Sequence, residues 1–288
     1  MFLRRTPDAS APLPFAASLA PVPPVAPARS RKALCGRALG AVVAAASAAA
    51  LLAGPAAPRA DAAPSGSYRV SGIDTSHHNH PGDQAIDWAR VRAAGHAFMF
   101  AKATEGATEQ DRWFARDMQG AKEAGLIRGA YHLYGRTPGA EQARNLVKAM
   151  KSAGYTGRAA GELPPAIDLE LRDGTACPAN FSAGQLRDFL RVVDDELGVR
   201  PIVYTTPSFV NTCMRKDGSP FRGHLLWQPR YRSGQAEPKS VPGAGAEWTF
   251  WQHSEEGVVT GTPKTSRTDL DVFRGTRAEL RRLAHLPS

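Results

Sequence analysis

The segment LPPAIDLELRD, residues 163–173, decides how the chain is read, because an apolar run ends there in two carboxylates two positions apart. On an extended strand such residues point to the same side, about 6 to 7 Å apart. Asp168 and Glu170 are therefore expected side by side at the mouth that the strand opens onto. Two close carboxylates repel, so one keeps its proton while the other is charged. Cleavage of a glycosidic bond needs this division of labour; a solvated strand end is the alternative.

Further apolar runs closing on polar or aromatic residues predict seven more strands, at residues 70–76, 98–106, 127–134, 201–205, 225–231, 248–252 and 269–273. Helical patterns separate the early ones, at residues 86–94, 111–124, 140–153 and 182–197. This alternation indicates parallel βαβ units, and functional groups at successive strand ends indicate one face of a barrel. After Tyr204 the last internal helix candidate is 207–214. We therefore expect an α/β fold: an irregular, TIM-like β/α barrel with fewer helices in its last third.

Seven short motifs occur in a fixed order: GIDTS (72–76), KATEG (102–106), GAYH (129–132), AIDLE (166–170), PIVY (201–204), WQ (251–252) and DLD (269–271). With them the chain resembles the N,O-diacetylmuramidase lysozymes, glycoside hydrolase family 25, over roughly residues 70–275. The resemblance implies a modified β/α barrel that hydrolyses the β-1,4 bond between N-acetylmuramic acid and N-acetylglucosamine in peptidoglycan. It implies Glu170 as proton donor, with Asp168, Asp74 and Asp269 as the other carboxylates. One departure is Asp271, where the family commonly has asparagine.

The candidate substrate-binding residues stand at the predicted strand ends: Lys102, Glu105, His132, Tyr134, Tyr204, Trp227, Tyr231, Trp251 and Gln252. Large rings at such positions either pack the barrel mouth or offer flat faces to sugar rings. Trp227 and Tyr231 are the expected stacking pair, since the chain leaves that strand through a proline. Trp248 and Trp251 cannot both face inward on a regular strand, so Trp251 is expected in the groove and Trp248 in the core. For His132 a hydrogen-bonded core position is the alternative to a substrate contact.

Carboxyl groups two residues apart are too close for the water-filled gap of an ordinary inverting pair. They suit a direct nucleophile, or assistance by the 2-acetamido group of the substrate with Asp168 orienting that amide. Inversion by a water that Asp74 or Asp269 activates from across the groove stays open. Two other functions also remain: hydrolysis of another N-acetylated glycan such as chitin, and a non-catalytic barrel that binds cell-wall glycan.

The first 62 residues differ in kind from the rest. Residues 1–28 are rich in proline and alanine without periodicity, which predicts disorder. Basic residues then precede an apolar run at 38–53, and Ala60-Asp61-Ala62 offers a small-x-small cleavage site. This pattern predicts a secretory signal; the alternative, a membrane span, needs about 20 apolar residues. We therefore expect one barrel domain at residues 63–288, secreted or periplasmic, monomeric and without stable membrane insertion.

Charge and cysteine content fit an exported wall-active protein. The formal net charge is +9 for the whole chain and about +4 without residues 1–62, which favours adsorption to an anionic cell wall over nucleic-acid binding. Cys177 and Cys213 are expected to form a disulfide in an oxidising compartment, with two free thiols as the alternative. His77, His78 and His80 lack the helical spacing of metal ligands, so no metal or cofactor is expected.

Overall fold

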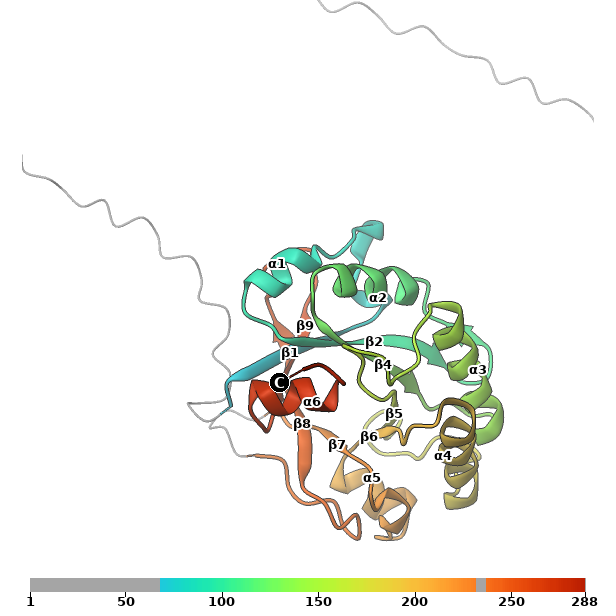
Figure 1. Ribbon diagram of the computed structural model, residues 1–288. Coiled ribbons are helices and arrows are strands. Elements are labelled where there is room, and N and C mark those ends of the chain that lie inside the picture. The colour runs from blue at the N-terminus through green and yellow to red at the C-terminus, as the bar shows by residue number, and fades with distance from the viewer. Residues whose placement is uncertain (1–67, 232–236, 288) are drawn as a thin grey trace, which may run out of the picture. The chain divides into compact units, whose positions relative to one another are not determined.

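A computed structural model describes residues 68–231 and 237–287 and shows a closed barrel of eight strands (Figure 1). In order around the ring these strands are β1 (Val70–Thr75), β2 (Phe98–Glu105), β4 (Ile127–Leu133), β5 (Ala166–Leu169), β6 (Ile202–Thr205), β7 (Leu226–Pro229), β8 (Trp248–Gly257) and β9 (Thr268–Phe273). Parallel pairing of β1 with β2 closes the ring. The short β3 (Glu109–Gln110) pairs with β2 outside it. The predicted α/β barrel is confirmed, whereas the predicted signal and extension lie outside the described residues.

Helices cover the first two thirds of the barrel. They are α1 (Trp88–Ala93), α2 (Phe114–Glu123), α3 (Gly139–Ser152), α4 (Ala183–Leu197) and α5 (Pro207–Cys213), with α6 (Arg277–Leu283) following the last strand. Short 3₁₀ helices lie at His77–Asn79, Pro81–Asp83 and Ser219–Phe221. In Figure 1, α1 to α5 follow one another around the ring, and no α-helix intervenes between β7 and β9 among the residues described. The expected loss of helices in the last third is thus confirmed.

The longest of these helices, α4, shows how the local sequence sets its bounds. Ser182 caps its start, because its hydroxyl accepts a hydrogen bond from the Gln185 backbone N–H. Gly198, with φ of 66°, ends it in the left-handed conformation that glycine adopts without strain. Its apolar stripe, which includes Leu186, Phe189 and Val193, is fully buried. No helix of the described residues is long and apolar enough to cross a membrane.

Aromatic rings fill the barrel interior beneath its mouth. Phe100 stacks on Trp227 with ring centroids 4.4 Å apart, and Phe250 packs edge-on against Phe100 at 5.2 Å. Glycine makes this packing possible, because a Cβ on Gly129 would lie only 2.1 Å from the Phe100 ring. The rings close the barrel below the strand ends, so a ligand enters only as far as this floor.

The last strand runs against its neighbours. β9 is antiparallel to both β8 and β1, so its first residues lie at the end of the barrel where the parallel strands finish. Asp269 consequently stands opposite Asp74 in the β1–β9 register. The following helix, α6, lies at the other end of the barrel, where Leu280 shares a core cluster with Val70.

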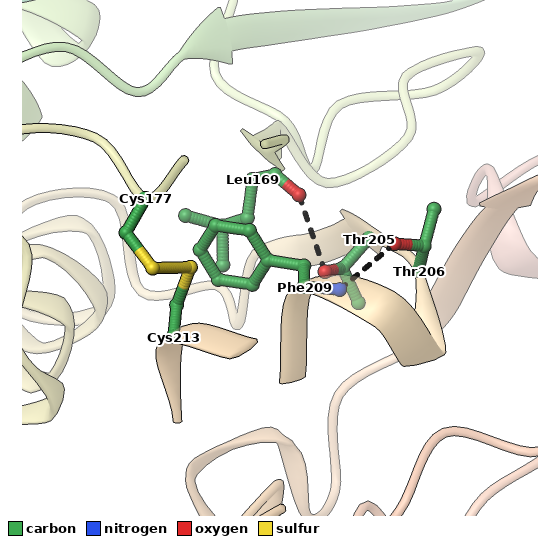
Figure 2. The surroundings of a disulfide bond; sticks show 6 residues. All are labelled: Leu169, Cys177, Thr205, Thr206, Phe209 and Cys213. Atoms are coloured by element: carbon green, nitrogen blue, oxygen red, sulfur yellow. Dashed lines mark hydrogen bonds between the residues drawn. A yellow bond between two sulfur atoms is a disulfide. The ribbon is translucent and has the colours of Figure 1, made fainter. Parts of the chain in front are cut away.

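A disulfide joins Cys177, in the loop after β5, to Cys213 at the end of α5, with Cα atoms 5.6 Å apart (Figure 2). The same region is held by Thr205, whose hydroxyl donates to the Leu169 carbonyl oxygen over 3.2 Å. The predicted bridge is confirmed. It fastens the loop that directly follows Glu170 to the neighbouring βα unit.

Candidate active site

A pocket of about 300 Å³ opens at the end of the barrel where the parallel strands finish. This is a volume typical of small-ligand sites. Predicted site residues from seven strands and their adjoining loops line it: Asp74, Lys102, Asp168, Glu170, Tyr204, Trp227, Tyr231, Gln252 and Asp269. The other lining residues are Ser76, His78, Tyr131, Leu133 and Glu255.

Asp168 and Glu170 face the same pocket, as their spacing predicts, but in different surroundings. Asp168 is buried, and its Oδ1 has no hydrogen-bond partner among the described residues. Burial, reinforced by the charge of Glu170, holds the pKa of Asp168 well above its usual range. Glu170, one residue beyond β5, is exposed at the rim. Partial desolvation by the pocket walls still raises its pKa, while Tyr204, Arg172 and Lys102 oppose the rise.

Two cations stand beside this acidic pair. The Lys102 ammonium donates to Glu105 Oε2 over 2.7 Å, and Arg172 lies 3.9 Å from the other Glu105 oxygen. Glu105 therefore orients both cations but is absent from the pocket lining. Both cations lower the pKa of Asp168 and Glu170, so their field favours the ionised form that burial disfavours.

A second acidic group lies across the mouth. β9 is four strands from β5 in a ring of eight, so Asp269 and Asp74 stand opposite Asp168 and Glu170. The Gln252 side-chain amide donates to Asp74 Oδ2 over 2.6 Å and to Asp269 Oδ2 over 3.2 Å. Burial raises the pKa of Asp269 to about 9, with the neighbouring Asp74 adding to the rise. The pKa of Asp74 is also raised well above its usual range, first by burial and then by the charge of Asp271.

Tyrosine hydroxyls complete the network around Gln252. Tyr204 donates to Gln252 Oε1 over 2.8 Å, and Tyr231 donates to the same oxygen. Tyr231 is 42% exposed and presents its ring at the rim. Trp227 is only 1% exposed and one face of its ring stacks on Phe100. The expectation that Trp227 offers a stacking face to sugar is therefore wrong; it forms the floor beneath the site.

Three further predicted contacts point away from the pocket. His132 is fully buried behind β4, where its ring nitrogens meet Thr104 Oγ1 at 2.7 Å and Gln142 Oε1 at 3.1 Å. Tyr134 is buried edge-on against Phe181. Trp251 is buried near Trp248 in a small cluster, not in the groove. Alternation along each strand is the reason, since Gln252 faces inward and its neighbour Trp251 must then face outward.

Sequence reasoning also missed residues that do line the pocket. Tyr131 and Leu133 flank His132 on β4 and face the pocket, whereas His132 faces away. The sequence reasoning assigned the inward face of this strand one residue too far along. Glu255 lies on β8 beyond the predicted end of that strand, where the pairing with β9 is irregular. Ser76 and His78, in the loop after β1, also line the pocket.

Two histidines of the loop after β1, His77 and His80, pair with different carboxylates. The partly exposed His77 has its Nδ1 2.9 Å from Asp111 Oδ2, whereas the buried His80 has its Nε2 2.9 Å from Asp117 Oδ2. The His80 ring also stacks on Trp113 with centroids 3.9 Å apart. These pairs anchor the loop that carries His78 into the pocket wall.

A β/α barrel with paired acids in a pocket at the strand ends is the arrangement expected of a glycoside hydrolase. The comparison with known families agrees: residues 73–262 match the glycosyl hydrolases family 25, and the chain belongs to that family. It is 31% identical to lysozyme M1 of Streptomyces globisporus, over 77% of this chain and 74% of that protein. It is 29% identical to the N,O-diacetylmuramidase of Chalaropsis, over 67% and 92%. The crystal structure of a bacterial lysozyme from Streptomyces coelicolor superposes with a TM-score of 0.64 at 31% identity, covering 75% of this chain and 96% of that one.

Proposed function

We propose that the protein is a lysozyme that hydrolyses the β-1,4 bond between N-acetylmuramic acid and N-acetylglucosamine in peptidoglycan. The observation that carries this proposal is the arrangement of Asp168 and Glu170 in one pocket, with an unpartnered buried oxygen on Asp168. The family relatives named lysozyme and N,O-diacetylmuramidase support the choice of bond. The glycan strand is the partner, and secretion or export to the periplasm gives the protein access to it.

In this proposal Glu170 protonates the leaving oxygen. Its place at the rim allows contact with a glycosidic oxygen, and a bound glycan would cover it and strip its water. Loss of water raises a carboxyl pKa further, so substrate binding itself favours the protonated acid. Lys102 and Arg172 limit that rise and keep the group able to release its proton.

Asp168 is suited to orient the 2-acetamido group of the sugar, since its unpartnered Oδ1 is a free acceptor for the amide N–H. The amide oxygen would then attack the anomeric carbon as the bond to the leaving oxygen breaks. A base across the groove is the competing mechanism. The raised pKa values of Asp74 and Asp269 disfavour it, because a base must be ionised. These two acids, with Gln252 and the tyrosines, are better suited to hold sugar hydroxyls.

The test is digestion of purified peptidoglycan followed by identification of the new reducing ends. Muramic acid ends are expected. Glucosamine ends would identify a glucosaminidase instead, and release of sugar from chitin with none from peptidoglycan would shift the assignment to another N-acetylated glycan. Binding without any new reducing ends would leave a non-catalytic barrel.

A further inference from the structure

The deepest acid of the site, Asp271, is fully buried below the pocket and is not among its lining residues. It lies two residues beyond Asp269 on β9, on the same face of the strand, opposite Gly72 of β1. Its Oδ1 accepts a hydrogen bond from the Trp227 indole N–H over 2.8 Å. Its Oδ2 is buried and receives no N–H or O–H among the described residues. Asp74 is its diagonal neighbour on β1, because the register pairs Asp74 with Asp269 and Gly72 with Asp271. The carboxyl groups of Asp74 and Asp271 interact, and each changes the pKa of the other.

Two ionised carboxylates cannot hydrogen-bond to each other, because neither has a proton to donate. A contact between two buried acids is stable only when one proton lies between them, as in other carboxyl pairs that share a site. Two donors already fix the outer oxygens of this pair, since Gln252 donates to Asp74 and Trp227 donates to Asp271. A proton shared between the two carboxyl groups is therefore needed to make their contact favourable.

We propose that Asp74 and Asp271 form a shared-proton pair, in which Asp271 is a positioning residue that fixes the Asp74 carboxyl toward the pocket and controls the pH at which it ionises. For the role of Asp74 in catalysis this inference rests on the proposed function; for the shared proton it does not. Titratable groups face the pair from several elements. They are Asp269 on β9, Tyr131 on β4, Asp168 on β5 and Tyr231 after β7. Lys102, the cation that lines the pocket, acts on Asp168.

The raised pKa values agree with this geometry. Burial raises the pKa of Asp271 to about 8, with Asp269 adding to the rise while Trp227 and Asp74 oppose it. The folded protein thus keeps a proton that the unfolded chain releases near pH 4. When the folded state binds more protons than the unfolded state, stability falls as the pH rises. The protein should therefore lose stability from about pH 4 up to about pH 8 through this pair.

The decisive experiment measures the melting temperature against pH for the wild type and for Asp271→Asn. The amide keeps the shape, donates to Asp74 permanently and cannot ionise, so the fall between pH 4 and pH 8 should be shallower in the variant. The matched control is Asp195→Asn, an exposed aspartate paired with Arg191 on α4, which should follow the wild type. Parallel curves for Asp271→Asn and wild type would overturn the shared proton.

A second measurement needs no variant. Carboxyl-carbon NMR of the wild type should show Asp74 and Asp271 titrating together in two steps, the upper one well above pH 4, as coupled acids do. Independent single titrations near pH 4 would overturn the pair. Activity gives a third reading: in Asp271→Asn the limb of the KM–pH profile that reports the sugar-holding Asp74 should move to lower pH, because the permanent amide donor lowers the pKa of Asp74. An unmoved limb would remove the positioning role, and lack of muramidase activity in the wild type would refute the proposed function while leaving the stability and NMR results intact.

Discussion

Gln252 donates its side-chain amide to Asp74 over 2.6 Å, and this contact lowers the pKa of a buried acid that its surroundings otherwise raise. Gln252→Met keeps the volume and removes the donor. The free energy of unfolding should fall by about 1 to 3 kcal/mol, as expected when buried polar partners are left unsatisfied. The pKa of Asp74 should rise, and carboxyl-carbon NMR of the variant should show its titration at higher pH than in the wild type. Gln119→Met, at an exposed site on α2, is the control for stability.

Glu170→Gln should lower turnover on cell walls by about 10²- to 10⁴-fold, because the amide has no proton to give to the leaving oxygen. Folding should be unaffected, since the side chain stands at the exposed rim. The rate of lysis of a purified wall suspension measures the effect. Glu196→Gln, at an exposed position on α4, should retain wild-type rates. Near-full activity in Glu170→Gln would contradict the assignment of the acid.

Glu170→Gln should also lower the pKa of the neighbouring Asp168. After burial, the charge of Glu170 is the largest cause of the raised pKa of Asp168, so Glu170→Gln should let Asp168 ionise at lower pH. Carboxyl-carbon NMR of the variant reads this directly. A titration of Asp168 that stays where it is in the wild type would mean that the two acids are not electrostatically coupled.

Replacement of the rim residue Tyr231 and of the floor residue Trp227 by alanine should have different effects. Tyr231→Ala should weaken binding of long glycan strands more than that of short fragments without lowering the melting temperature, because the ring is exposed. Trp227→Ala should lower the free energy of unfolding by about 3 to 5 kcal/mol, as for other buried aromatic residues. Binding assays on graded fragments together with thermal melts separate the two. Tyr231→Phe keeps the ring and loses only the hydroxyl, so it tests whether stacking is the source of the affinity.

The disulfide should contribute to stability by up to roughly 4 kcal/mol, since it closes a loop of more than thirty residues in the unfolded chain. Reductant should lower the melting temperature of the wild type, whereas a Cys177→Ser, Cys213→Ser double variant should already melt low and be insensitive to reductant. Intact mass before and after alkylation checks the pairing. Two freely alkylated thiols in exported protein would contradict it.

The acids of this site could be predicted from the sequence, because each one stands in or directly after an apolar run. Strand β5 is an example. Asp168 is two residues from Glu170, so the two carboxylates share a side whichever way the strand is turned. The same reasoning failed on β4, where both faces of a parallel barrel strand are buried and apolar. Nothing in the sequence marks whether Tyr131 or His132 faces inward. Glu255 was missed for another reason, since irregular pairing extends β8 into a stretch that reads as a polar loop.

The reversed direction of β9 also decides how the protein can be attached to a solid support. Because β9 ends away from the mouth, α6 and the last described residues lie at the end of the barrel opposite the pocket. Figure 1 labels α6. A linker placed after α6 would therefore hold the barrel with its pocket facing the solution. Beads or sensor surfaces coated through that end should present the groove to insoluble glycan, whereas coupling through surface lysines at random would turn part of the molecules toward the support.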